Sequence, residues 1–177
     1  MVRTWRATDA CGNAATCSQT ITVVDTTAPE IVCATNAVVP CTAPEGAAVS
    51  FEVTATDVCD ANVQVLCVPV SGSMFPLGSV LVQCVATDVN GNASQCSFTV
   101  TVIDVVPPLI TCPAGFAVLE DPPGSGQAAV SFAAPSASDN CDLHPAIVCS
   151  PPSGSVLPLG DTVVLCVATD ASGNTNG

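Results

Sequence analysis

A stretch of 22 residues occurs twice in this chain, and the distance between the copies sets the size of the folding unit. Residues 71–92 are SGSMFPLGSVLVQCVATDVNGN, and residues 153–174 are SGSVLPLGDTVVLCVATDASGN. The end of the stretch returns a third time in residues 4–13, TWRATDACGN. Cys33 and Cys112, which occupy corresponding positions in successive copies, are 79 residues apart. A period of about 80 residues is too long for a solenoid repeat and is typical of a small domain used in tandem.

Each copy has the pattern of β-strands. Four segments of the first complete copy alternate apolar with polar or small residues and are rich in Val, Thr and Ile: 49–54, 63–68, 79–87 and 96–104. Gly, Pro, Asn and Asp lie between them, and no window has a helical period. Several short strands at such spacing predict an all-β fold built of β-sandwich modules.

Pro-containing segments mark the expected module boundaries, because Pro disfavours continued strand pairing. They divide the chain into the tail of one module (1–28), a complete module (29–107) and a third module (108–177). Only Thr-Asn-Gly follows Asn174, so we expect the third module to lack its last strand. The chain opens with a spare copy of that strand.

The charge balance excludes several classes of partner. The chain has 15 acidic and 2 basic residues, a net charge of −13, and no Lys; its basic residues are Arg3 and Arg6. Nucleic-acid binding requires clustered Lys or Arg, and an anionic membrane surface repels such a chain. Pro and Gly interrupt the uncharged runs, so we expect no membrane insertion.

The cysteine content indicates an oxidising compartment. Twelve Cys in 177 residues favour an extracellular or cell-surface location. The first residues, MVRTWRATD, lack the apolar stretch of a signal peptide. We therefore expect either that an export signal has been removed or that these residues belong to a longer chain.

The recurring motifs resemble the hyalin repeat (HYR) family over essentially the whole chain. They are a Cys-Pro at Cys112, an Asp-Asn-Cys at 139–141, the SGS-x-x-P-x-G turn, and V-x-C-x-A-T-D-x-x-G-N followed by C-x-F-x-V-x-V-x-D. Ala34 and Val58 depart from the pattern. The resemblance implies disulfide-stapled immunoglobulin-like sandwiches of extracellular adhesion or surface proteins, without catalysis.

Six cysteines in the complete module allow fifteen pairings, which the sequence alone leaves open. The resemblance and the topology that it implies favour Cys33 with Cys96, Cys41 with Cys59, and Cys67 with Cys84. Alignment of the modules adds Cys149 with Cys166.

Metal-thiolate and catalytic functions are weak alternatives. The cysteine spacings lack the C-x2-4-C knuckle of zinc sites, and no Lys is present to activate a thiol. The single His144 stands before Pro145 in an acidic segment and is interpreted as a solvated loop residue. We therefore expect a protein that is not an enzyme.

Acidic residues recur at fixed places in the repeat. We interpret Asp9, Asp88 and Asp170 as caps of Gly-Asn turns. Calcium, which prefers clustered oxygen ligands, is the cofactor hypothesis for the loop and junction residues, although no EF-hand pattern is present. These candidate ligands are Asp57, Asp60, Asp139, Asp142, Asp25 and Asp104. Asn92 begins a glycosylation acceptor sequence.

The leading functional hypothesis is a structural or adhesive extracellular protein, with tandem modules forming a stalk or fibre. Its partners are copies of itself or neighbouring modules, with a cell-surface protein or glycan as a further candidate. The alternative is a carbohydrate- or protein-binding module of a larger secreted protein. Sugar-binding faces usually display Trp or Tyr, and the chain has no Tyr and one Trp, Trp5, which favours the structural hypothesis.

The two ends of the chain suggest a mode of assembly. Four cysteines lack partners within their own modules: Cys11, Cys17, Cys112 and Cys141. Residues 14–25 are of the strand type that the third module lacks, so one chain is expected to complete the next by strand addition, with Cys17 reaching Cys112 and Cys11 reaching Cys141. Residues 2–10 must then pack elsewhere. The alternative is a longer tandem array with the same pairings along one polypeptide.

Overall fold

The computed structural model describes residues 1–177 and contains strands and loops without a helix, which confirms the all-β prediction. The strands in chain order are β1 (Val2–Thr8), β2 (Ala14–Thr20), β3 (Glu30–Val32), β4 (Ala37–Pro40), β5 (Ala47–Val49), β6 (Thr54–Thr56), β7 (Gln64–Val68), β8 (Ser73–Phe75), β9 (Gly78–Thr87), β10 (Ala93–Ile103), β11 (Leu109–Thr111), β12 (Gln127–Val130), β13 (Ser136–Ser138), β14 (Ala146–Ser150), β15 (Ser155–Pro158), β16 (Leu165–Thr169) and β17 (Thr175–Asn176). Since the chain forms no helix, it contains no helical segment that could span a membrane.

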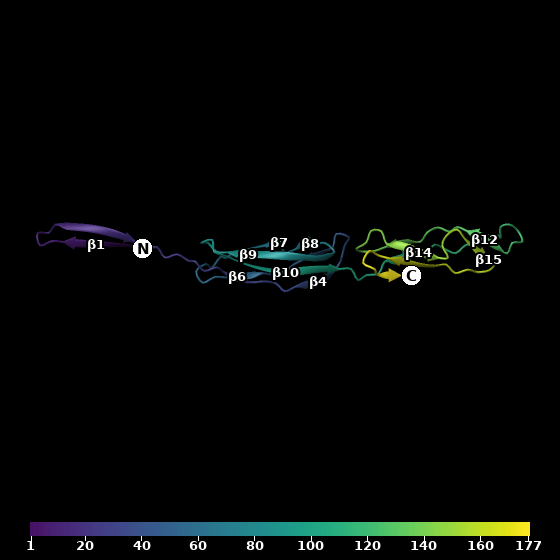
Figure 1. Ribbon diagram of the computed structural model, residues 1–177, viewed down its shortest axis with the longest axis horizontal. Coiled ribbons are helices and arrows are strands. Elements are labelled where there is room, and N and C mark those ends of the chain that lie inside the picture. Colours follow the sequence, from purple (N-terminus) through teal and green to yellow (C-terminus); the bar gives the residue numbers. More distant parts are fainter. The chain divides into compact units, whose positions relative to one another are not determined.

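The contacts divide the chain into two compact units. The first consists of residues 1–33, 53–67 and 83–96. It holds the antiparallel hairpin of β1 and β2, in which Trp5 is opposite Cys17, and the antiparallel pair of β3 and β6 (Figure 1). Every residue of β1 and β2 is exposed, so this hairpin has no apolar face buried within the chain.

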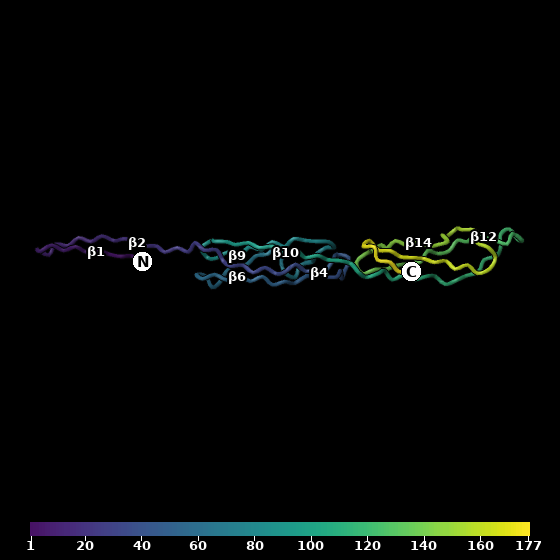
Figure 2. Tube along the Cα trace, turned by 60° about the horizontal axis from the view of Figure 1, so that its bottom comes forward, coloured from purple at the N-terminus to yellow at the C-terminus, as the bar shows by residue number.

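The second unit consists of residues 34–52, 68–82 and 97–177. Its antiparallel pairs join β5 to β8, β11 to β13, β12 to β15, and β16 to both β14 and β17. β4 runs parallel to β10, with Pro40 opposite Ile103. The largest sheet of the chain as a whole has four strands in the order β4-β10-β9-β7, and the trace in Figure 2 shows β9 and β10 side by side.

The long strands place every second side chain in the core, as the sequence alternation predicts. On β10, Phe98, Val100 and Val102 are buried while the residues between them are partly exposed. The ring of Phe51 packs edge-on against Phe98, with ring centroids 4.8 Å apart. β9 follows the same rule, with Val82 fully buried. One face of each strand therefore supplies the apolar interior of a thin sandwich with few aromatic side chains.

The expected strand over 49–54 is wrong, because it is interrupted between β5 and β6. There the Phe51 backbone bonds to a side chain instead of a neighbouring strand: its N–H donates to Ser71 Oγ at 2.9 Å, and its C=O accepts from the same hydroxyl at 2.8 Å. Phe132 and Ser153 make the equivalent two bonds in the next copy, at 3.0 and 3.2 Å. The first Ser of each S-G-S turn thus satisfies backbone groups that would otherwise need a strand partner.

Candidate functional site

Four disulfides cross-link the chain. Three of them have the pairings that the family resemblance implies: Cys33–Cys96, Cys67–Cys84 and Cys149–Cys166. The equal separations of the last two, 17 residues each, reflect their equivalent places on both sides of the S-G-S turn.

The fourth disulfide joins Cys41 to Cys141 across 100 residues, so the expected pairing of Cys41 with Cys59 is wrong. The expected link of Cys11 to Cys141 is corrected by the same bond. Cys41 and Cys141 are both buried, and the Asn140 side-chain amide donates to the Cys41 carbonyl oxygen at 3.1 Å. Cys11, Cys17, Cys59 and Cys112 are free and exposed.

Cys41 and Cys59 lie in different units of the chain and make different backbone contacts. The Cys41 N–H donates to the carbonyl of Ile103, the last residue of β10, at 2.7 Å. Asp60, next to Cys59, accepts instead from the N–H of Val89 in the turn before β10, at 2.8 Å. Cys41 and Cys141 thus belong to the same unit, whereas Cys59 belongs to the other.

A group of three carboxylates forms where three strands of the second unit end. Asp104 follows β10, Asp139 follows β13 and Asp170 follows β16, and one oxygen of each lies within 4.8 Å of the others. Asp170 is only 6% exposed, and Asp139 Oδ2 is buried without a hydrogen-bond partner. Since the chain provides no Lys, no ammonium group offsets this concentration of negative charge.

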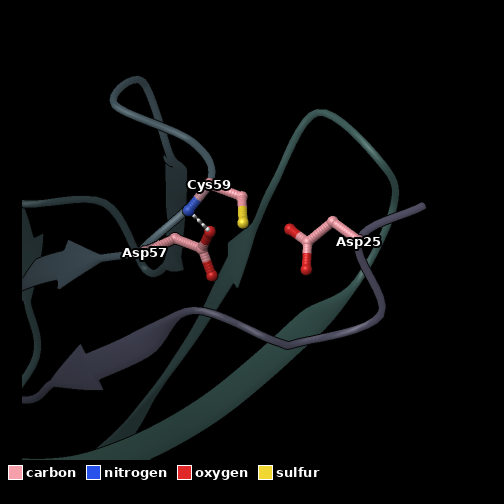
Figure 3. A group of neighbouring side chains, drawn as sticks. All are labelled: Asp25, Asp57 and Cys59. Carbon is pink, nitrogen blue, oxygen red and sulfur yellow. Dashed lines mark hydrogen bonds between the residues drawn. The ribbon is translucent and has the colours of Figure 1, made fainter. Parts of the chain in front are cut away.

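The preceding copy holds a related group, in which Asp25 and Asp57 correspond to Asp104 and Asp139 but the third member is the thiol of Cys59, also within 4.8 Å (Figure 3). Asp25 Oδ2 is buried and unpartnered, like Asp139 Oδ2. The Asp25 carboxylate, with Asp57 and Asp88 contributing, raises the pKa of the Cys59 thiol. The Asp104, Asp139 and Asp170 group has three carboxylates and a buried oxygen that accepts no hydrogen bond, which is the chemistry of a hard-cation site. The group with Cys59 offers two carboxylates and a thiol, and sulfur is not a ligand that calcium prefers.

A family model described as the HYR domain matches residues 24–102 and again residues 103–177. The chain belongs to the HYR domain family. We call these ranges the first and second HYR repeats. The boundaries expected at 28/29 and 107/108 stay predictions.

Curated relatives contain the same repeat within much longer proteins. Hyalin of Strongylocentrotus purpuratus is 34% identical over 181 residues, covering 98% of this chain and 15% of hyalin. "Sushi, von Willebrand factor type A, EGF and pentraxin domain-containing protein 1" of Rattus norvegicus is 38% identical over 104 residues, covering 57% of this chain. The chain spans only 3% of that rat protein.

Two candidate ligands of the HYR repeats lie outside the carboxylate groups. Asp60 Oδ1 accepts from the N–H of Asn62, and its Oδ2 accepts from Val89. Asp142 accepts equivalently from the N–H groups of His144 and Ala171, at 2.8 and 2.9 Å. Both carboxylates therefore fasten a loop to the neighbouring turn. His144 itself is an exposed loop residue, as its sequence context predicts.

Asp170 contributes to a group although the sequence indicated only a turn cap. Its Oδ1 accepts from the N–H groups of Ser172 and Asn174, and its Oδ2 from the Asn174 amide, at 2.8 to 2.9 Å. Asp88 caps its turn identically through Asn92. Burial raises the pKa of Asp88 and Asp170. The hydrogen bonds from the Asn side chains and the turn N–H groups together lower it by more than burial raises it, so each pKa lies below the ordinary value. In the sequence, the only signal that Asp170 belongs to the carboxylate group was that Asp recurs at this position of the A-T-D motif in every copy.

Proposed function

We propose that this chain is an extracellular structural protein of the adhesion type, in which HYR repeats form a stalk or a head-to-tail filament. The observation that carries the proposal is the Cys41–Cys141 disulfide, which bonds the first HYR repeat to the second. A covalent bond between successive repeats restricts their separation under load, which an enzyme or an isolated binding module does not require. The HYR family and the hyalin relatives support an extracellular, non-enzymatic role.

Calcium is the cofactor in this proposal. The group consists of Asp104, which directly follows β10, and of Asp139 and Asp170 from two loops of the second repeat. A bound cation would therefore hold the end of β10 to these two loops. Calcium takes six to eight oxygen ligands, and the buried free oxygen of Asp139 supplies one without breaking a hydrogen bond.

Strand addition provides the longitudinal contact of the filament. The second HYR repeat has a cavity of about 500 Å³ lined by apolar groups that include Phe116, Val118, Val130, Leu157 and Val164. In the first repeat β10 contributes the buried side chains of Phe98, Val100 and Val102 to the core. Residues 14–25 of a second copy are the proposed occupant, because they align with β10 and carry exposed Ile21 and Val23.

Negative-stain electron microscopy of native material, with and without a calcium chelator, tests the proposal. We expect thin fibres or stalks that become flexible or shorter on chelation. Isolated globular particles in both conditions would contradict it and favour an accessory binding module. Surface labelling of intact cells with an antibody to this chain checks the extracellular location.

A further inference from the structure

The Asp-rich loops of the two HYR repeats, residues 57–62 and 139–144, have the same internal hydrogen bonds. Asp57 Oδ1 accepts from the N–H groups of Cys59 and Asp60 at 2.8 and 3.0 Å. Asp139 Oδ1 accepts from the N–H groups of Cys141 and Asp142 at 2.8 and 2.9 Å. Because backbone bonds fix both loops identically, Cys59 and Cys141 hold the same place in their repeats.

The surroundings of these two cysteines differ. Cys141 is buried and bonded to Cys41 of the preceding repeat, while Cys59 is an exposed free thiol. Apolar side chains beside Cys59 are also uncovered: Val58 is 97% and Val89 is 81% exposed. The loop around Cys59 therefore has the same conformation as the loop that Cys41 contacts through Cys141, but no other repeat contacts it in this chain.

We propose that Cys59 forms a disulfide with a cysteine at the Cys41 position of another HYR repeat, which packs on the loop around Cys59 as the first repeat packs on the second. This inference rests on the proposed function, since it extends the covalent junction by one repeat. Cys41 of this chain is already bonded. At its position in the second repeat stands Glu120, whose Oε2 accepts from Gly126 N–H at 3.0 Å, so the partner is a repeat that carries Cys there.

The bond forms by thiol–disulfide exchange with a low-molecular-weight disulfide such as oxidised glutathione. The Cys59 thiolate attacks one glutathione sulfur, and the other glutathione leaves as a thiolate. The partner cysteine, as a thiolate, then attacks the Cys59 sulfur and displaces the second glutathione. Two protein thiols are oxidised, one glutathione disulfide is reduced, and the two protons released from the protein are taken up by the glutathione thiolates.

Disulfide mapping of the native protein tests this inference. Free thiols are blocked before extraction, and a protease that cleaves before Asp releases residues 57–59 as one peptide. We expect this peptide to be bonded to a peptide of an HYR repeat with its cysteine at the Cys41 position. Recovery of 57–59 with a blocked free thiol, or bonded to Cys11, Cys17 or Cys112, would overturn the inference. The bond of 139–141 to 25–56 in the same digest reports separately on the proposed function.

A recombinant arm supplies the missing partner position. The Glu120→Cys chain gives the second repeat a cysteine where the first has Cys41, with Glu120→Ser as the matched control. In a glutathione redox buffer we expect Glu120→Cys to form disulfide-linked multimers in steps of the 17.6 kDa chain mass. All of these chains also carry Cys11→Ser, Cys17→Ser and Cys112→Ser, which removes the expected Cys17–Cys112 link between chains. Glu120→Ser and Glu120→Cys/Cys59→Ser should then form at least tenfold fewer multimers. Equal multimers with and without Cys59 would overturn the proposal.

Discussion

Removal of the Cys41–Cys141 disulfide should lower the stability of the unit that contains both cysteines. The perturbation is the double variant Cys41→Ala/Cys141→Ala, because alanine leaves no unpaired hydroxyl at two buried positions. Cys59→Ala is the matched control, since this cysteine is exposed and free.

The magnitude follows from the loop that the bond closes. Its sequence separation is 100 residues, but the Cys33–Cys96 bond shortens the path to about 50 residues. A loop of that length corresponds to about 4 kcal/mol of lost conformational entropy in the unfolded chain. For a unit of this size, in which 1 kcal/mol shifts the midpoint by about 4 °C, we expect the thermal midpoint to fall by about 16 °C.

Differential scanning calorimetry at fixed scan rate measures the effect. The double variant should melt lower than the wild type by the stated amount, and Cys59→Ala should melt with the wild type. The reasoning is refuted if Cys59→Ala lowers the midpoint while Cys41→Ala/Cys141→Ala leaves it within about 2 °C of the wild type.

Three further predictions concern the carboxylates and the Ser hydroxyls that bond to the Phe51 and Phe132 backbone. Calcium at 100 times its dissociation constant should stabilise the folded chain by about 2.7 kcal/mol in thermal titrations after chelation, and Asp139→Asn should abolish most of the gain; a flat wild-type response would contradict the calcium site. Because the folded pKa of Asp88 and Asp170 lies below the unfolded value, the folded state binds fewer protons, so their stabilisation is present above pH of about 4 and is lost on further acidification. Circular dichroism melts from pH 7 to 2 should show this loss, and Asp88→Asn/Asp170→Asn should flatten it; an unchanged pH slope in that variant would count against the caps. Ser71→Ala and Ser153→Ala should each cost about 1 to 3 kcal/mol in denaturant unfolding, because the Phe backbone groups lose their partner, and a loss below about 0.5 kcal/mol would argue that water replaces the hydroxyl.

Much of the fold could be predicted from local pattern. The alternation in 79–87 and 96–104 matches β9 and β10, because one face of each strand is buried and the other is not. The strand break after Val49 could not be predicted, since it depends on the Ser71 hydroxyl, 20 residues from Phe51.

The candidate site was only partly predictable. Asp25, Asp57, Asp104 and Asp139 were candidate ligands from their recurrence, whereas Asp170 was interpreted only as a turn cap. The separation of Asp60 from Asp57 depends on which backbone N–H groups each carboxylate meets in the folded loop. The Cys41 partner was missed because an even number of cysteines in one module favoured a closed set. The mismatch between Cys141 and Glu120 was the sequence signal that Cys41 pairs outside its own module.

The central claim is that successive HYR repeats are joined by a disulfide between Cys41 and Cys141. Cleavage before Asp of the thiol-blocked, unreduced 177-residue chain, followed by mass spectrometry, tests it directly. Cys33 and Cys41 share the peptide 25–56, Cys96 lies in 88–103, and Cys141 lies in 139–141. The account predicts one species containing these three peptides. A species in which 25–56 is bonded to 57–59, with 139–141 recovered as a blocked free thiol, would contradict it.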